Sequence, residues 1–593
     1  MIPTGPATAR AGDALTRPPH ALRRVALALM TLAALLAPAQ QLLAQTQGLP
    51  EPAPVRLPAL GESAAEDITV AMERKLGDQI MAEIRRDPDY LDDPVLLEYL
   101  DGLWQPLVQA ARTRGDIEAD TAALFAWEAF LVRDKSVNAF ALPGGFVGVH
   151  LGLIAMTASR DELASVLAHE LTHVTQRHIA RSIVSQQRGA LLSMAALVLG
   201  LLAASRSNNP DVAQAAIAGG QAAMIQGQLN FSRDMEREAD RIGFALLAQA
   251  GYDGHGMATM FDKLEQANRL NDSGSFPYLR SHPLSFERQA EARLRMQGGA
   301  ASPARASTPL LHALMGARAR VLMDANPQSL RRLQEPPMLR AGQGTPEHAA
   351  ALVAGALASV RLRDTALAKE RLHQARALLG DDVDPAALRL LAFVDAETRL
   401  AAGDAAGTLQ RLAELRSRDG GTAGARPALL MQAQAAALLQ GPGREAALRE
   451  VTESLQTWVA AHPRDALAWH ELGHSAEALG LRLRALRAQA EARLLLGDMT
   501  GAIDRLRSGR NLSRGATAGQ DFIEASIIDS RLRALEAQRR QQAAEARRSR
   551  GGPQRGPNGE TDRETDRGEP PPARDDTQAP PRAVLQAAST EAR

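Results

Sequence analysis

The sequence predicts a mainly α-helical protein, in which an α+β domain with a small β-sheet precedes an all-helical solenoid. Residues 67–300 have mixed helical patterns and one strand-like stretch, whereas residues 309–538 are almost entirely Ala/Leu/Arg-rich helix, broken at short intervals by Gly and Pro. A length of 593 residues also exceeds what one hydrophobic core usually fills, so two or more domains are expected.

The composition removes several classes of chemistry. The chain has no cysteine, which excludes disulfides, thiolate nucleophiles and cysteine-ligated metal or iron–sulfur sites. Lys+Arg and Asp+Glu both number 68, so the chain lacks the excess positive charge typical of nucleic-acid-binding proteins, and no nucleic-acid partner is expected. Any metal site must therefore use histidine and carboxylate ligands.

The first residues have the pattern of an export signal. Basic residues precede the apolar run Val25–Ala37, and Ala37-Pro38-Ala39 offers the small residues that a signal peptidase needs, with an alternative cleavage site after Ala44. A membrane anchor is the other interpretation, but this run spans only about 20 Å of a bilayer core of about 30 Å. We expect residues 1–39 to be removed on export to the periplasm, and residues 40–66 to form a linker.

Residues 161–178 carry the pattern that points to chemistry. Apolar residues recur at helical intervals, and Asp161 and Glu162 suit the first turn of a helix. His169 and His173, four residues apart, would lie about 40° apart on one helix face, so both imidazoles could reach one metal ion. Glu170 lies beside that face, where its carboxylate could act on a water molecule. The alternative is an ordinary helix with two surface histidines.

A catalytic metal needs a third protein ligand and an open position. His178, nine residues after His169, would point about 180° away on a continuous helix, so a surface or second-layer position is expected for it. Glu236 and Asp240 share a helix face, with a small residue between them that allows a close approach. Glu236 could bind the ion and Asp240 could accept an imidazole N–H, whereas Glu238 is expected to be solvated. A charged surface helix is the alternative for this segment.

The H-E-x-x-H segment followed by E-x-x-A-D resembles the HtpX-like gluzincin metalloproteases. Within them, the chain looks most like the periplasmic β-barrel assembly-enhancing proteases, which carry a tail of tetratricopeptide (TPR) repeats. The resemblance covers residues 57–300 strongly and 310–535 loosely. Its further matches are Leu57–Gly61, Asn138–Gly145, Ser281-His282-Pro283 and Arg288.

The resemblance implies a zincin-like protease fold with one zinc ion per chain. The implied zinc ligands are His169, His173 and Glu236. Glu170 would be the catalytic base, and Asp240 would support a ligand or donate a proton.

Other segments suggest how substrate reaches this site. His282 and Arg288 are candidates to stabilise the negative oxygen of the reaction, and in the resembled family His282 could instead occupy the open metal position as a gate. Phe146–His150, after the turn at 143–145, reads as a strand that could pair with an extended peptide; a plain structural hairpin is the alternative.

Residues 189–224 form two small-residue, apolar stretches between the motif helices. A buried or lid-forming hairpin over the site is the preferred interpretation. The alternatives are a contact with the membrane surface and a true membrane span, although the first stretch reaches only about 24 Å of the required 30 Å or so.

Residues 309–538 contain an internal duplication, since Ala396–Leu412 matches Ala490–Leu506 at nine of 17 positions. The segment from Trp469 to Gly473 resembles the start of a TPR, whose stacked helices form a concave surface for protein partners; an unrelated helical bundle is the alternative. His470 to His474 repeats the H-E-x-x-H pattern, but no E-x-x-A-D follows, so no metal is expected there. Residues 539–593 lack large apolar side chains and are expected to be a disordered tail.

Three classes of function follow. The first is an exported zinc metalloendopeptidase with protein substrates, acting, as the resemblance implies, in outer-membrane protein assembly and quality control, peripheral to the outer membrane. The second is a chaperone-like binding scaffold whose proteolytic site is latent. The third, a catalytically idle scaffold, is disfavoured by the complete set of ligands and base.

Overall fold

The structure is a computed structural model that describes residues 68–185, 232–270, 278–298, 309–335, 344–380, 383–418, 426–513 and 520–550. The predicted signal, linker and 189–224 hairpin lie outside the described residues, as do residues 551–593 of the predicted tail. None of the described helices combines the length and the apolar character that crossing a membrane requires.

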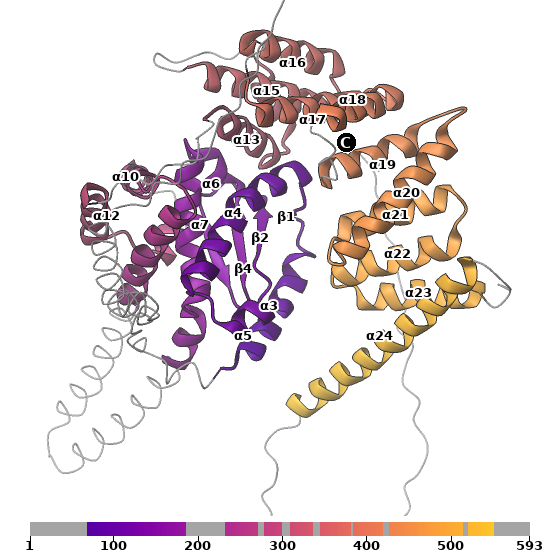
Figure 1. Ribbon diagram of the computed structural model, residues 1–593, viewed down its shortest axis with the longest axis horizontal. Helices are drawn as coiled ribbons and strands as arrows, with labels where there is room; N and C mark the ends of the chain where they lie inside the picture. Colours follow the sequence, from indigo (N-terminus) through magenta and orange to yellow (C-terminus); the bar gives the residue numbers. More distant parts are fainter. Residues whose placement is uncertain are drawn as a thin grey trace, which may run out of the picture.

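A four-stranded sheet with the order β1-β2-β4-β3 lies in the N-terminal part of the chain (Figure 1). The edge strands β1 (Tyr90–Leu91) and β3 (Ala139–Leu142) are antiparallel to their neighbours, whereas β2 (Glu128–Val132) runs parallel to β4 (Phe146–His150). A turn at residues 143–145 joins β3 to β4, and its two glycines have φ values of 77° and 89°, which other residues rarely adopt. The predicted mainly α-helical fold with a small sheet is confirmed.

Helices cover both faces of this sheet. On one face, α3 (Val70–Ile84) packs through Met81 against Phe130 and Phe146. On the other face lie α4 (Pro94–Arg114) and α7 (Arg160–Thr175), which share a core with alternate strand residues such as Leu131 and Val149. This alternation of sides along each strand is the usual pattern of a sheet that is buried on both faces.

Short and long helices complete the N-terminal region around α7. Residues 178–185 and 232–249 are helical, and α10 packs directly on α7. The labelled helices of this part are α5 (Ala119–Leu124), α6 (Leu151–Met156), α10 (His255–Leu270), α11 (Tyr278–Ser281) and α12 (Phe286–Gly298).

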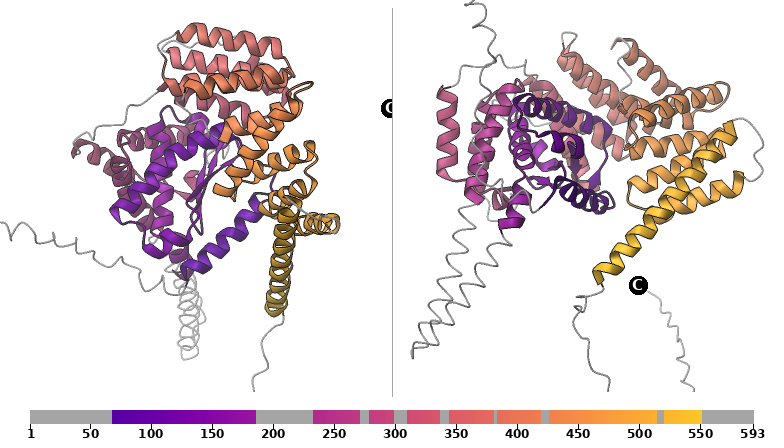
Figure 2. Two further views of the ribbon diagram at one scale, coloured as in Figure 1. Left: turned by 45° about the vertical axis from the view of Figure 1, so that its right-hand side comes forward. Right: turned by 60° about the horizontal axis from the view of Figure 1, so that its bottom comes forward.

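The remaining described chain is entirely helical, and consecutive helices pack on each other (Figures 1 and 2). These helices are α13 (Pro309–Leu322), α14 (Pro327–Gln334), α15 (Thr345–Arg361), α16 (Thr365–Leu379), α17 (Pro385–Ala401), α18 (Ala405–Arg418), α19 (Arg426–Leu438), α20 (Arg444–Ala461), α21 (Ala466–Ala478), α22 (Arg482–Leu495), α23 (Met499–Ser513) and α24 (Gln520–Arg550). Residues 539–550, predicted as part of the tail, continue α24 as helix.

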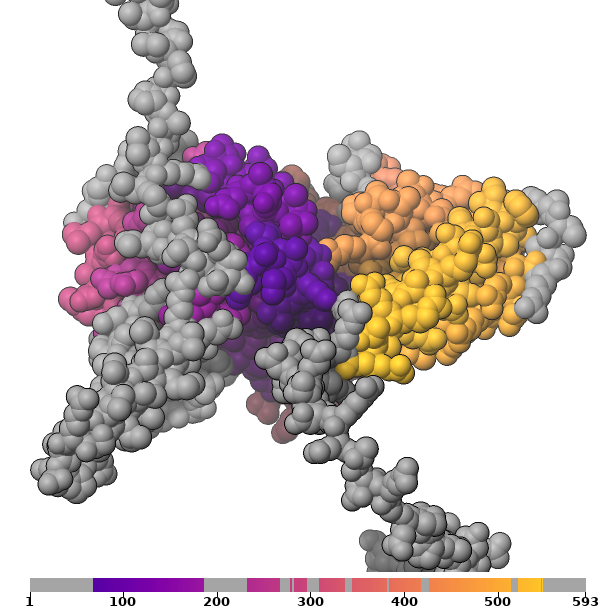
Figure 3. All heavy atoms as spheres, turned by 90° about the horizontal axis from the view of Figure 1, so that it is seen from below, coloured from indigo at the N-terminus to yellow at the C-terminus, as the bar shows by residue number. Residues whose placement is uncertain are grey.

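The C-terminal helices are not a separate appendage. One cluster of buried apolar residues extends from Leu91 to Met431, so helices α13–α18 and the start of α19 share a hydrophobic core with the sheet and α7. Two smaller cores serve α19–α24. The space-filling view in Figure 3 shows these later helices, in orange and yellow, beside the indigo N-terminal residues. Residue 300, the predicted domain boundary, therefore does not separate two hydrophobic cores.

Candidate metal centre

Helix α7 begins as its sequence predicts. Ser159 caps it by accepting a hydrogen bond from the backbone N–H of Glu162 at 3.2 Å, and Asp161 and Glu162 lie in its first turn. Its residues 161–174 are all buried. His169 and His173 share one side, with ring centroids 4.7 Å apart and Nε2 atoms 3.0 Å apart.

The third element is the helix at residues 232–249, which approaches α7 closely. A Cβ on Gly243 would lie only 3.2 Å from the backbone nitrogen of His169, so a larger residue would separate the helices. This approach places one oxygen of Glu236 3.3 Å from His169 Nε2 and the other 3.4 Å from His173 Nε2. The predicted set of His169, His173 and Glu236 therefore converges on one point.

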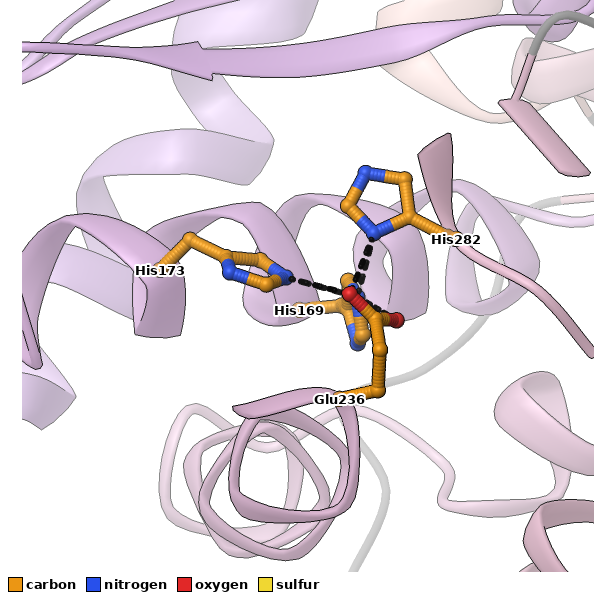
Figure 4. A group of neighbouring side chains, drawn as sticks. All are labelled: His169, His173, Glu236 and His282. Atoms are coloured by element: carbon orange, nitrogen blue, oxygen red, sulfur yellow. Dashed lines mark hydrogen bonds and ion pairs between the residues drawn. The ribbon is translucent and has the colours of Figure 1, made fainter. Parts of the chain in front are cut away.

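His282 completes the group from the segment after α11. Its Nδ1 lies 2.9 Å from Glu236 Oε1 and 3.3 Å from His169 Nε2. Ligand atoms of His169, His173, Glu236 and His282 all lie within 4.8 Å of one another, and Figure 4 shows the side chains pointing inward. Within the described ranges no other group of three such residues exists, which includes the second H-E-x-x-H at residues 470–474.

Asp240 and Arg288 hold the far side of His169. Asp240 Oδ1 lies 2.9 Å from His169 Nδ1, and Arg288 donates two hydrogen bonds to the same carboxylate, at 2.6 and 2.8 Å. Arg288 also donates to the Pro283 carbonyl at 2.8 Å and lies 3.0 Å from Glu236 Oε2. The guanidinium is thus directed at protein groups, and the predicted contact with a reacting oxygen stays a prediction.

Two carboxylates make this centre attractive to a cation. Burial alone would raise the pKa of Glu236, but hydrogen bonds from His169 and His282 outweigh it and hold the pKa far below its usual range. Burial would also raise the pKa of Asp240, but hydrogen bonds from Arg288 and His169 outweigh it and lower the pKa below its usual value. Against the effect of burial, Asp240 and Glu236 raise the pKa of His169 to about 10. The centre therefore stabilises positive charge, which a metal ion would also bring.

Glu170 is completely buried beside these ligands. Neither of its carboxylate oxygens has a hydrogen-bond partner among the described residues. Burial raises the pKa of Glu170, and the nearby charges of His282 and His169 oppose that increase. The ring of His282 lies next to it, with Nε2 3.5 Å from Glu170 Oε1. A buried carboxylate with so little hydrogen bonding is costly unless a bound group uses it, so this side chain fits a centre that binds a metal ion and water.

His178 takes the second-layer position that was one of its two expected places, but it points toward His173 instead of away, and Glu238 is not solvated. Arg177 has a left-handed backbone with φ of 51°, so His178 begins a new helical segment instead of continuing α7. The His178 ring is buried, and its Nδ1 lies 2.8 Å from His173 Nδ1. Glu238, expected to be solvated, is bound by His178 and Arg181, whose hydrogen bonds lower its pKa to about 2.

The strand predicted to pair with substrate is also different. β4 has β2 on one side and β3 on the other, so its backbone groups are already used inside the sheet. The edge strand beside α7 is β3 (Ala139–Leu142), which contacts that helix. The reason is the parallel pairing of β2 with β4, which the pattern of one strand and one turn does not reveal.

Tyr278 is a residue of the site that the sequence pattern did not indicate. Its buried ring lies 4.7 Å from the His282 ring and 6.4 Å from the His169 ring, measured between centroids. Burial, followed by the charge of Glu170, raises its pKa well above the usual range. Only its place four residues before His282 could have suggested a role.

Comparison with known proteins agrees with this geometry. Residues 106–296 match peptidase family M48. The β-barrel assembly-enhancing protease of Yersinia pestis is 31% identical over 468 residues, which are 78% of this chain and 89% of that protein. A putative β-barrel assembly-enhancing protease of Vibrio cholerae is 40% identical over 242 residues, and the Escherichia coli K12 protein of that name is 36% identical over 239. These two matches cover 41% and 40% of this chain but only 48% and 47% of the relatives, about half their length.

Proposed function

Because the chain belongs to the family of β-barrel assembly-enhancing proteases and contains a peptidase family M48 domain, we propose that it is a zinc-dependent metalloendopeptidase of the periplasm. Family membership makes it a metallopeptidase. The convergence of His169, His173 and Glu236 beside the buried Glu170 carries the proposal of zinc and of this catalytic site.

Zinc fits the donor set. Catalytic zinc commonly has three ligands of imidazole nitrogen and carboxylate oxygen and keeps one position open. The Nε2 atoms of His169 and His173 and the carboxylate of Glu236 would hold it. Burial and the charge of His169 lower the pKa of His173 well below its usual value, which favours the neutral imidazole that binds metals. When bound, zinc would acidify a water molecule and polarise the peptide carbonyl.

The chain's own residues supply the proton transfers. Glu170 takes a proton from water at a carboxylate oxygen and delivers it to the nitrogen of the leaving amine. Its burial raises the pKa and so makes the carboxylate a better base. Asp240, fixed by two hydrogen bonds from Arg288, keeps His169 oriented throughout.

A second candidate function is a latent protease that acts as a binding scaffold, and the position of His282 favours it. The three ligands leave one metal position open, and His282 Nδ1 points to the same centre. Its Nε2 lies 3.5 Å from Glu170 Oε1 on the other side of the ring. In this arrangement His282 takes the place that a substrate carbonyl needs, so hydrolysis requires its displacement.

The proposed substrates are proteins, consistent with the names of the relatives. The edge strand β3 could align an extended peptide along α7. A groove of about 1430 Å³ lies between the sheet and α20–α22, with charged and aromatic walls that include Arg85, Glu128, Arg389, Trp458 and His470. We propose that the stacked C-terminal helices are TPR-like repeats. Their surface would bind outer-membrane proteins during assembly, or the machinery that assembles them.

The proposed location follows from the predicted signal at residues 1–39, which would export the chain to the periplasm. Family membership suggests a role in the assembly of outer-membrane proteins, so we propose that the mature protein lies at the periplasmic side of the outer membrane. For residues 189–224, a hairpin over the site stays the preferred interpretation, and a contact with the membrane surface stays the alternative.

The test is Glu170→Gln, which keeps the shape of the site and removes the base. We expect one zinc ion per chain, as in the wild type, and a loss of about 100- to 10,000-fold in hydrolysis of a misfolded outer-membrane protein. Glu471→Gln, in the second H-E-x-x-H segment, is the matched control and should keep full activity. Wild-type hydrolysis by Glu170→Gln would overturn the assignment. Clients retained by this variant in the periplasm would identify the substrates.

A further inference from the structure

A chain of polar contacts lies behind His173, on the side away from the centre. His178 Nδ1 is 2.8 Å from His173 Nδ1, and His178 Nε2 is 3.0 Å from Glu238 Oε2. Arg181 donates to the same oxygen of Glu238 at 2.8 Å. Nothing in the proposed catalytic scheme uses His178, Glu238 or Arg181.

The hydrogen positions in this chain have one consistent arrangement. Glu238, paired with Arg181, is an acceptor, so His178 Nε2 carries the hydrogen of their contact. The two Nδ1 atoms at 2.8 Å need one donor and one acceptor. If His178 donated there as well, it would be a buried cation beside the Arg181 guanidinium. His178 Nδ1 therefore accepts, and His173 Nδ1 donates.

This arrangement decides which nitrogen of His173 is free to bind. A neutral imidazole with its hydrogen on Nδ1 has a lone pair on Nε2. His173 Nε2 is the atom that faces His169 Nε2 at 3.0 Å and Glu236 Oε1 at 3.4 Å. The contact behind the ring therefore prepares the ring for a metal ion in front of it.

The backbone explains how the chain achieves this contact. The left-handed conformation of Arg177 turns the chain after α7, and Arg177 is held there by a hydrogen bond to Glu73 at 2.9 Å. Without that turn His178 would follow the helix away from His173. Glu238 reaches the pair from the helix that also carries Glu236, so one helix supports both sides of the centre.

Each of the two histidines of α7 therefore has a hydrogen-bond partner behind its ring. His169 is backed by Asp240, which Arg288 fixes. We propose that His178, held by Glu238 and Arg181, is a positioning residue that keeps His173 in the Nδ1-protonated form and so presents Nε2 to the metal. This inference rests on the proposed zinc centre, but it concerns the ring behind a ligand and makes its own prediction.

The test measures zinc affinity of the full mature chain by competition with a chelator, with zinc as the only probe. We expect His178→Ala to weaken binding by about 10- to 100-fold, as loss of a hydrogen-bond partner of a ligand usually does. His178→Asn, which keeps an acceptor oxygen close to the place of Nδ1, should lie between this variant and the wild type. Glu238→Ala keeps the His178 ring but removes its hydrogen-bond partner on the far side, so it should also weaken zinc binding.

A second measurement is independent of zinc and of activity. In the metal-free chain with 15N-labelled histidine, NMR should show the His173 hydrogen on Nδ1 in the wild type and a mixture of both forms in His178→Ala. The matched control is His312→Ala, which removes another buried histidine with two hydrogen bonds, to Tyr99 and to the Thr157 carbonyl. It should lower stability and leave zinc affinity unchanged.

The outcomes separate the two proposals. A wild-type chain that does not bind zinc overturns the proposed function. A wild-type chain that binds zinc, with His178→Ala and Glu238→Ala within twofold of its affinity, overturns only the role of His178. An unchanged His173 hydrogen position in those variants does the same. If His178→Ala fails to fold, His178→Asn and Glu238→Ala provide the decisive affinities.

Discussion

At the scale of single residues, His282 contacts both carboxylates that matter for hydrolysis. Its Nδ1 is 2.9 Å from Glu236 Oε1, and its Nε2 is 3.5 Å from Glu170 Oε1. One ring therefore touches the proposed metal ligand and the proposed base together. Tyr278 packs against this ring with an interplanar angle of 30°, which supports it in that position.

We expect His282→Ala to hydrolyse peptides faster than the wild type. In the wild type, displacing His282 breaks its hydrogen bond to Glu236. A hydrogen bond to a charged group is worth about 1.5–3 kcal/mol, so removing this step should raise the rate of hydrolysis about 10- to 100-fold. Initial rates on a fluorogenic peptide measure the effect. His255→Ala, at a histidine whose side chain is 62% exposed, is the control and should leave the rate unchanged. A lower rate in His282→Ala would show that the ring assists hydrolysis and would contradict the latent state.

The residues of the centre were predictable where they lie on regular helices. His169, His173 and Glu236 are brought together by helical spacing and by two helices that approach closely. His178 was not, because the turn before it depends on a left-handed Arg177, a conformation that the sequence normally signals with glycine or asparagine. The contacts of Glu238 were missed for the same reason, since they depend on where His178 lies.

At the scale of elements, the spacing between α7 and the helix at 232–249 controls the site. Gly243 lies where a Cβ would be 3.2 Å from the His169 nitrogen and 3.3 Å from the carbon of Ala168. Both neighbours are backbone atoms of α7, which cannot turn aside as a flexible side chain could. Glu236 is on the same helix, so any widening of this contact moves it away from the histidines.

We expect Gly243→Ala to lower the free energy of unfolding by about 1–3 kcal/mol, as overpacking does, and to weaken zinc binding. Urea unfolding and chelator competition measure the two effects. The control is Gly102→Ala on α4, where an added Cβ meets nothing within 4 Å; there the higher helix propensity of alanine should stabilise the protein by about 0.5–1 kcal/mol. Equal stability of the two variants would mean that the contact is loose.

The strand pattern was predictable only in part. Phe146–His150 and the turn before it are recognisable because β-forming residues follow Pro-Gly-Gly. The strand's position inside the sheet depends on β2, which pairs with it in parallel from a separate segment. Local patterns carry no information on such a pairing, so β3 could be identified as the edge strand of the described sheet only from the structure.

At the scale of the whole molecule, a buried ion cluster joins the protease region to the C-terminal helices. Arg318 on α13 donates two hydrogen bonds of 2.7 Å to Asp93, which caps α4, and another of 2.7 Å to Glu397 on α17. Burial opposes ionisation of Asp93, but the charge and hydrogen bonds of Arg318 hold its pKa below the usual range. Asp92 is bound in the same way by Arg426 of α19 at 2.7 Å.

We expect Arg318→Met to lower the free energy of unfolding by about 3–5 kcal/mol near neutral pH, because it leaves the buried Asp93 and the half-buried Glu397 without their cation. The loss should shrink as the pH falls below about 3.9, because the depressed pKa of Asp93 contributes stability only while its carboxylate is ionised. Arg449→Met, at an exposed ion pair, is the control and should have little effect. A loss below about 1 kcal/mol for Arg318→Met would show that the cluster does not hold the regions together.

The hydrophobic core that passes from Leu91 to Met431 has a consequence for how this protein can evolve. The match to peptidase family M48 stops at residue 296, ahead of α13, yet α13 packs on α6 and buries residues in the same core as α7. A gene fragment ending where that homology ends would leave this face of the protease bare. The catalytic region and the helices that follow it from α13 must therefore be inherited together. A substitution in the catalytic part of the shared core has to be accommodated by the helical part, and the reverse.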